Sequence, residues 1–154
     1  EAMFFIDSLI QLWELDGVVP RAQVTDDAIA NLQRSYGVQL PSDVRAFYER
    51  FNGLLGDMDC DLNAFWPIEA LGTVAAKVEP YFPGIASRIP NSDQLFAFAD
   101  HSIWVHVYAM ELSDDPLAAT PVFWIADGAF ARLTDTFAGF WELYLASPHR
   151  IIVP

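Results

Sequence analysis

The chain has 154 residues, of which 53% are hydrophobic and 14% are aromatic. This composition excludes a disordered chain and predicts one folded domain, whose core is large enough to need no disulfide. Eight Lys and Arg residues against 21 Asp and Glu residues give a formal net charge of −13. Such a charge repels phosphate groups, so it argues against binding to nucleic acids and to anionic membranes.

The apolar residues do not form a membrane-spanning segment. Spanning takes about 20 consecutive apolar residues, and the longest charge-free stretches, 101–110 and 116–126, are shorter and contain His, Ser or Pro. Asp7 interrupts the apolar N-terminal stretch, which argues against a secretory signal. The one cysteine, Cys60, cannot form an internal disulfide. This is usual in a reducing compartment, so we expect a cytoplasmic protein.

The first third of the chain has the pattern of three helices. Apolar residues at helical spacing predict a helix over 2–13. A second helix is expected to begin at Thr25 and to end at Gly37. Ser42 is a favourable N-cap for the third, and Asn52-Gly53 is expected to end it, because both residues tolerate the left-handed conformation.

From residue 54 onward the pattern favours short strands. The segment 73–88 is weakly helical and is broken by Pro80 and Pro83, and Thr134 is a candidate cap for a final helix. The predicted strands are 62–67, 95–99, 103–112, 121–126 and 129–133, with a helical turn at 68–71 and a reversal at Asp100-His101-Ser102. Helices, a meander of strands and a closing helix predict an α+β fold, with residues 95–126 at the centre of an antiparallel sheet.

No catalytic motif is present in the sequence. It contains neither a glycine-rich phosphate loop nor a nucleophile elbow. His101 and His106 are separated by an odd number of residues, so we expect their side chains on opposite faces and no shared metal. Cys60 is expected to be a buried or semi-buried, inert thiol. The sequence therefore predicts a protein that is not an enzyme and that needs no cofactor.

The acidic segment 57–63 resembles the start of a calcium loop, because oxygen ligands alternate along it. An EF-hand needs Gly at the sixth position and Glu at the twelfth, and Leu62 and Ile68 stand there. We therefore expect no metal in this segment. A solvated acidic loop or an acidic contact surface explains the same residues.

Aromatic residues fall into two groups. One group has helical spacing and is expected in the core: Phe47, Tyr48, Phe51, Phe137, Phe140 and Trp141. In the other, Trp104, His106 and Tyr108 alternate along one face of a predicted strand. An antiparallel sheet can leave one face in water. If that face is open, its rings and the surrounding acids resemble the anchors of a protein interface.

Several segments resemble the SUKH superfamily, the Smi/Knr-type domain. They are Leu40–Tyr48 followed by Phe51-Asn52-Gly53, Trp66–Leu71, Phe96–Asp100, Pro121-Val122 and Phe137–Leu145. The resemblance covers about residues 25–146. It departs from the family at Leu54, where a second glycine is common, and at His101-Ser102, where a glycine-rich turn is common.

The resemblance implies an α+β domain with a curved antiparallel sheet and helices packed against it. Many bacterial members look like immunity proteins that neutralise a toxin, often a nuclease, and fungal relatives look like regulators of cell-wall synthesis. We therefore expect a cognate, basic protein toxin as the partner, with an intracellular regulatory scaffold as the alternative. The oligomeric state stays open. The expected contact residues are Asp57, Asp59, Asp61, Asp93, Asp100, Trp104, Tyr108, Asp114 and Asp115.

Overall fold

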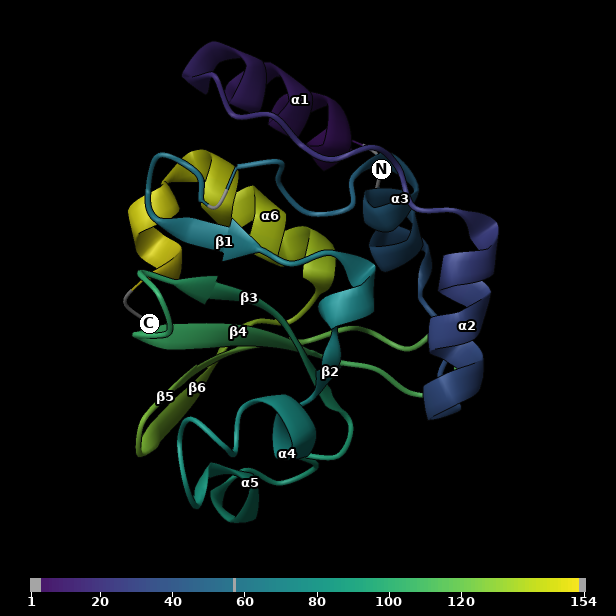
Figure 1. The fold of residues 1–154 in the computed structure, drawn as a ribbon, viewed down its shortest axis with the longest axis vertical. Coiled ribbons are helices and arrows are strands. Elements are labelled where there is room, and N and C mark those ends of the chain that lie inside the picture. The colour runs from purple at the N-terminus through teal and green to yellow at the C-terminus, as the bar shows by residue number, and fades with distance from the viewer. Residues whose placement is uncertain (1–3, 57, 153–154) are drawn as a thin grey trace.

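The computed structural model describes residues 4–56 and 58–152, and its elements follow the predicted order (Figure 1). The helices are α1 (Phe4–Asp16), α2 (Asp26–Tyr36), α3 (Ser42–Arg50), η1 (Ile68–Ala70), α4 (Val74–Lys77), α5 (Ile85–Arg88), α6 (Phe137–Ala146) and η2 (Pro148–Ile151). The strands are β1 (Asn63–Phe65), β2 (Gly72–Thr73), β3 (Leu95–His101), β4 (His106–Glu111), β5 (Val122–Ala126) and β6 (Ala129–Thr134). The predicted α+β fold is confirmed.

The six strands form one antiparallel sheet. Its order is β1-β3-β4-β5-β6, and β2 pairs with β3 as well. The interior strands β3, β4 and β5 come from residues 95–126, so this segment forms the centre of the sheet, as predicted. Nearly every residue of β3 and β4 is buried. A sheet with one face in water would alternate buried and exposed residues, so both faces of these strands must be covered.

Helices cover the two faces of the sheet unequally (Figure 1). The larger core lies between α1, α3 and α6 and the face that contains Phe98 and Tyr108. A smaller core forms on the other face, where the α4–α5 segment packs against Val107 and Ala109. The face with Tyr108, which was considered as open from the sequence, is covered by the larger core, and the α4–α5 segment covers the opposite face, so neither face of β4 is open.

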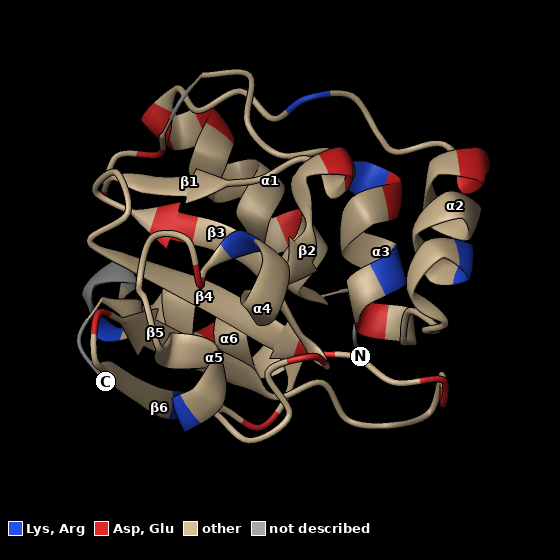
Figure 2. Ribbon diagram, turned by 60° about the horizontal axis from the view of Figure 1, so that its bottom comes forward, with Lys and Arg blue, Asp and Glu red and all other residues tan. Residues whose placement is uncertain are grey.

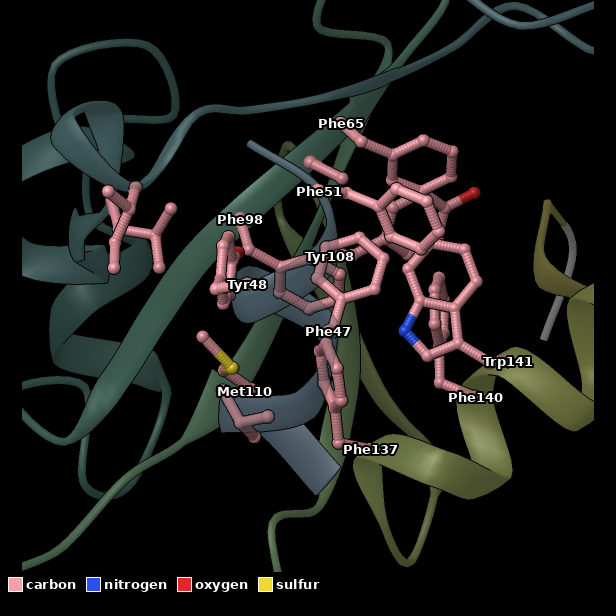
Figure 3. Close-up of a cluster of buried hydrophobic side chains, with 14 of the residues drawn as sticks. Phe47, Tyr48, Phe51, Phe65, Phe98, Tyr108, Met110, Phe137, Phe140 and Trp141 are labelled. Atoms are coloured by element: carbon pink, nitrogen blue, oxygen red, sulfur yellow. The ribbon is translucent and has the colours of Figure 1, made fainter. Parts of the chain in front are cut away.

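The larger core is built on aromatic rings from helices and strands (Figure 3). Trp141 of α6 stacks on Phe47 of α3 at 4.8 Å between ring centroids. Phe140 meets Phe98 of β3 edge-on at 5.4 Å. All six aromatic residues that were expected in the core are buried. Aromatic pairs of this kind each contribute about 0.5–1.5 kcal/mol beyond the burial of their area.

Two of the predicted helix caps are correct and two are displaced. The Thr25 side chain accepts a hydrogen bond from the Ala28 amide and Gly37 is left-handed, so both ends of α2 agree with the prediction. Ser42 is already the first residue of α3, whose cap is Pro41, so Ser42 was wrongly predicted as the N-cap. Thr134 belongs to β6, and Thr136 caps α6 instead by accepting a hydrogen bond from the Gly139 amide.

Asn52 and Gly53 follow the end of α3 rather than forming it. The helix ends at Arg50, and Phe51 is already extended. Gly53 has a φ of +76°, and a Cβ atom there would lie 2.7 Å from the carbonyl oxygen of Phe65. The glycine is therefore needed because two backbone segments approach each other closely.

The reversal between β3 and β4 lies later than predicted. Asp100 and His101 are still in β3, and β4 begins at His106, so the predicted strand 103–112 loses its first three residues to the turn. His101 and His106 are paired directly across the two strands. Cross-strand partners share one face, so the prediction that they point to opposite faces is wrong.

Candidate functional site

The structure divides the predicted contact residues into three groups. Asp57 lies outside the described residues. Asp59, Asp100 and Tyr108 are buried, so the prediction that they belong to an exposed contact surface is wrong. Asp61, Asp93, Trp104, Asp114 and Asp115 are exposed or half-buried.

Asp59 points into the protein because the local backbone and α6 supply it with donors. Its Oδ1 accepts hydrogen bonds from the amides of Asp61 (2.9 Å) and Asn63 (2.8 Å). Its Oδ2 accepts from the Tyr144 hydroxyl at 2.5 Å and from Asn63 Nδ2 at 3.3 Å. Four donors on one buried carboxylate explain why this residue of the acidic segment is not in solvent.

Asn63 extends these hydrogen bonds to the histidine pair. Its Oδ1 accepts from the Tyr108 hydroxyl at 3.3 Å and lies 3.1 Å from His101 Nδ1. Tyr108 uses its only proton in that bond, so its oxygen must accept from His106 Nε2, 2.9 Å away. The buried network therefore joins Asp59, Asn63, Tyr108 and both histidines, and this hydrogen-bonding pattern requires the Nε2–H tautomer of His106.

The network favours neutral side chains next to its carboxylate. Burial, and then the neighbouring His101, lower the pKa of His106 from 6.5 to about 4. The two histidine rings stack at 4.7 Å between centroids, so two positive charges there would repel each other. Burial, and then Asp59 and Asp100, raise the pKa of Tyr108. At neutral pH His106 and Tyr108 are therefore both uncharged.

Asp100 forms a separate set of hydrogen bonds at the end of β3. Its Oδ2 accepts a hydrogen bond from the Trp66 indole at 2.7 Å, and its Oδ1 accepts one from the Trp104 amide at 3.3 Å. The Trp104 ring then stacks on Tyr81 at 4.1 Å between centroids. Trp104 thus packs against the side of the sheet opposite His106 and Tyr108, and the predicted shared face of these three residues does not exist.

The exposed acids lie at two opposite ends of the sheet. Asp61 precedes β1 beside the β3–β4 turn, whereas Asp93, Asp114 and Asp115 lie near the start of β3 and the end of β4. The seven residues of β3 separate these ends by about 20 Å. Figure 2 shows acidic residues on α2, α3 and β3 as well as on several separate loops.

Sequence reasoning missed the exposed apolar residues beside Asp61. Leu62 is 47% exposed, Ile103 is 79% exposed and Val105 is 61% exposed. The backbone amide of Ser102 donates to the Leu62 carbonyl oxygen at 2.9 Å, which places Leu62 against the β3–β4 turn. Hydrophobic residues in a strand pattern predict burial, so their exposure follows only from the position of the turn.

Cys60 is exposed, so its predicted burial is wrong. Desolvation, and then the carboxylates of Asp16, Asp59 and Asp61, raise the pKa of its thiol. A raised pKa disfavours the thiolate that a nucleophile or metal ligand needs. Within residues 4–56 and 58–152, no group of three or more His, Cys, Asp or Glu residues is arranged to hold a metal ion. None of the described helices is both long and apolar enough to cross a membrane.

Comparison with known proteins identifies one family. The model of the SMI1 / KNR4 family (SUKH-1) matches residues 23–143, which include every strand of the sheet and most of α6. A comparison with curated proteins gives no match.

Proposed function

Because this chain belongs to the SMI1 / KNR4 family (SUKH-1), which includes toxin immunity proteins, we propose that it is an immunity protein. It binds a cognate bacterial toxin and neutralises it by occupying or locking the toxin's active surface. The toxin has a basic surface, as a nuclease has, and the complex forms in the cytoplasm of the producing cell. This chain itself catalyses no reaction.

The observation on which this proposal rests most is the uncompensated negative charge. The formal net charge is −13. Within the described part of the chain only two ion pairs form, Arg45–Glu49 and Arg132–Asp135. Most acidic side chains therefore contribute to an external field. Such a field can raise the association rate with a basic partner by about 10- to 1,000-fold, which favours an inhibitor that must capture a toxin quickly.

Nuclease inhibition would use the same field that excludes nucleic acid from this chain. A nuclease binds phosphate groups through clustered Lys and Arg residues. Carboxylates on an inhibitor satisfy those cations in place of phosphate, and mismatched partners are disfavoured by like-charge contacts. This account needs a binding surface but no reactive group.

A regulatory scaffold of the Smi/Knr kind is the second candidate, because the matching family is named for such proteins. A scaffold also binds proteins and also needs no catalytic residue. The two candidates differ in the partner: a scaffold binds components of a regulatory pathway, and its loss changes that pathway without any toxin being present.

Co-expression tests the proposal. The gene adjacent to the one that encodes this chain is induced in a heterologous bacterium, alone and together with this chain. We expect its product to stop growth and this chain to restore it. A second, unrelated immunity protein serves as the control for specificity. If the adjacent product is harmless, or remains equally toxic with this chain present, the immunity proposal is wrong and the scaffold is favoured.

A further inference from the structure

The β3–β4 turn forms an exposed apolar projection. We call residues 102–105 together with Leu62 the hairpin tip. Ile103 and Val105 are 79% and 61% exposed, and Leu62 lies beside them. Aliphatic side chains with this exposure cost solubility and contribute little to the core. Single exposed apolar residues are ordinary, but three on one turn and on the segment hydrogen-bonded to it indicate a contact site.

The backbone of the hairpin tip is strained. Leu62, Ser102, Ile103 and Trp104 have φ values of 68°, 50°, 56° and 66°. They are four of the five non-glycine residues with positive φ in the described chain. A positive φ is a genuine outlier for a β-branched residue such as Ile103, since glycine or asparagine adopts it more easily. Strain of this kind clusters at functional sites.

Contacts beneath the tip hold this conformation in place. Asp100 accepts the Trp104 amide, and the Val105 amide donates to the His101 carbonyl oxygen at 3.0 Å. The Trp104 ring is fixed between Tyr81 and Trp66, with centroids at 4.1 Å and 5.3 Å. The exposed aliphatic groups are therefore presented on a rigid support, which lowers the entropy cost of binding.

Negative charge surrounds the tip. Asp59 accepts a hydrogen bond from the amide of Asp61, the residue before Leu62, and Asp100 accepts one from the Trp104 amide, so both carboxylates lie next to the tip. Neither Asp59 nor Asp100 forms an ion pair with Lys or Arg in the described part of the chain. Arg88 lies at the same end of the sheet, where its guanidinium donates to the Gly128 carbonyl oxygen at 3.0 Å. Buried carboxylates that are hydrogen-bonded but not neutralised by Lys or Arg strengthen the negative electrostatic potential at this end of the sheet.

We propose that the hairpin tip is the docking surface for a partner protein that offers an apolar pocket bordered by Lys and Arg residues. The aliphatic groups of Ile103, Val105 and Leu62 enter the pocket, and the surrounding carboxylates attract its cationic border. This inference rests on the proposed function, since the toxin is the partner it describes. Of the two acidic ends of the sheet, this proposal selects the one at the β3–β4 turn. The contact residues are then Leu62, Ile103 and Val105 rather than the buried Asp59 and Tyr108.

Affinity measurements with matched variants test the proposal. The probe is the product of the adjacent gene, made non-toxic by substitution of its catalytic residue. Ile103→Asp should weaken its binding by about tenfold or more. Leu117→Asp is the control, because Leu117 is 92% exposed and lies in the β4–β5 loop at the other end of the sheet. This control should bind within about twofold of the parent chain.

Ile103→Asn separates binding from folding. Asparagine tolerates the left-handed backbone, so the melting temperature should stay the same or rise while affinity falls. If both Ile103 variants bind the probe as tightly as the parent chain, the tip is not the docking surface, although the immunity proposal stands.

If the parent chain does not bind the probe, the immunity proposal is contradicted. The hairpin tip is then tested separately, by photo-crosslinking from positions 103 and 117 in the native cells. A crosslink from position 103 alone to another protein, with binding to that protein lost in Ile103→Asp, would then support the tip. Crosslinks from position 117 alone, or from neither position, would overturn it.

Discussion

The Tyr144 hydroxyl donates a hydrogen bond to Asp59 Oδ2 at 2.5 Å, across 85 residues of sequence. Tyr144 lies in α6 and Asp59 lies in the acidic loop before β1. The Trp13 indole of α1 donates in turn to the Tyr144 oxygen at 3.1 Å. Three distant segments are thus joined through the Tyr144 hydroxyl, which fixes the loop that ends in Leu62.

Tyr144→Phe should destabilise the protein, and Tyr48→Phe is its matched control. Both tyrosines are buried, but the Tyr48 hydroxyl has no hydrogen-bond partner in the described part of the chain. Removing the Tyr144 hydroxyl leaves the Asp59 carboxylate and the Trp13 indole each short of a partner. We expect the free energy of unfolding to fall by about 2 kcal/mol for Tyr144→Phe, and to stay the same or rise for Tyr48→Phe. Urea denaturation measures both, and equal losses would contradict the network.

Acid should weaken the fold through His106. The pKa of His106 is about 4 in the folded protein and 6.5 in the reference state. The unfolded chain therefore binds this proton more readily, so the stabilising contribution is complete above pH 6.5 and is lost as the pH falls toward 4. The expected loss is about 1–3 kcal/mol. His106→Gln should reduce the difference in unfolding free energy between pH 6.5 and pH 4, and an unchanged difference would show that His106 does not titrate as described.

Gly53→Ala should destabilise the protein by more than the replacement of a left-handed glycine usually does. A Cβ at Gly53 would lie 2.7 Å from the Phe65 carbonyl oxygen and 2.9 Å from the Pro67 nitrogen. Gly17 also has a positive φ, of +72°, but nothing lies within 4 Å of its Cβ position. We expect a loss of about 1–2 kcal/mol for Gly17→Ala from backbone strain, and a larger one for Gly53→Ala. Similar midpoints in urea for the two variants would contradict the close approach.

Ile103→Asn should stabilise the folded chain. The side chain is largely exposed, so little buried area is lost, while the left-handed conformation at φ 56° becomes easier. The expected gain is about 1 kcal/mol, within the range for relief of such strain. A lower melting temperature would show that Ile103 stabilises the fold and would remove the argument from strain.

The sequence predicted the elements whose signals are local. The Thr25 cap and Gly37 bound α2 as expected, and alternation along 95–126 predicted the central strands. The predicted ends of helices and strands were wrong where contacts with other segments of the chain determine them. Ser102–Val105 continues the apolar pattern of a strand, but the pairing of His101 with His106 places the turn there. Turns formed by non-glycine residues in the left-handed conformation have no clear composition signal.

The candidate site was less predictable because burial of acids depends on distant partners. Asp59 and Asp61 look alike in the sequence, yet donors from Asn63 and Tyr144 take the first into the core. In the same way, Asp100 is buried by the Trp66 indole, 34 residues away. The packing of α4 and α5 on the second sheet face also escaped prediction, because each is a four-residue helix between prolines and glycines.

Titration of a purified toxin tests the central claim most directly. The toxic domain encoded by the adjacent gene is assayed for its own activity while this chain is added in steps, at low and at high salt. We predict that activity falls in proportion to the added chain and reaches baseline near one molar equivalent, with slower association at high salt because the charges are screened. Full toxin activity in the presence of a large molar excess of this chain would contradict the account.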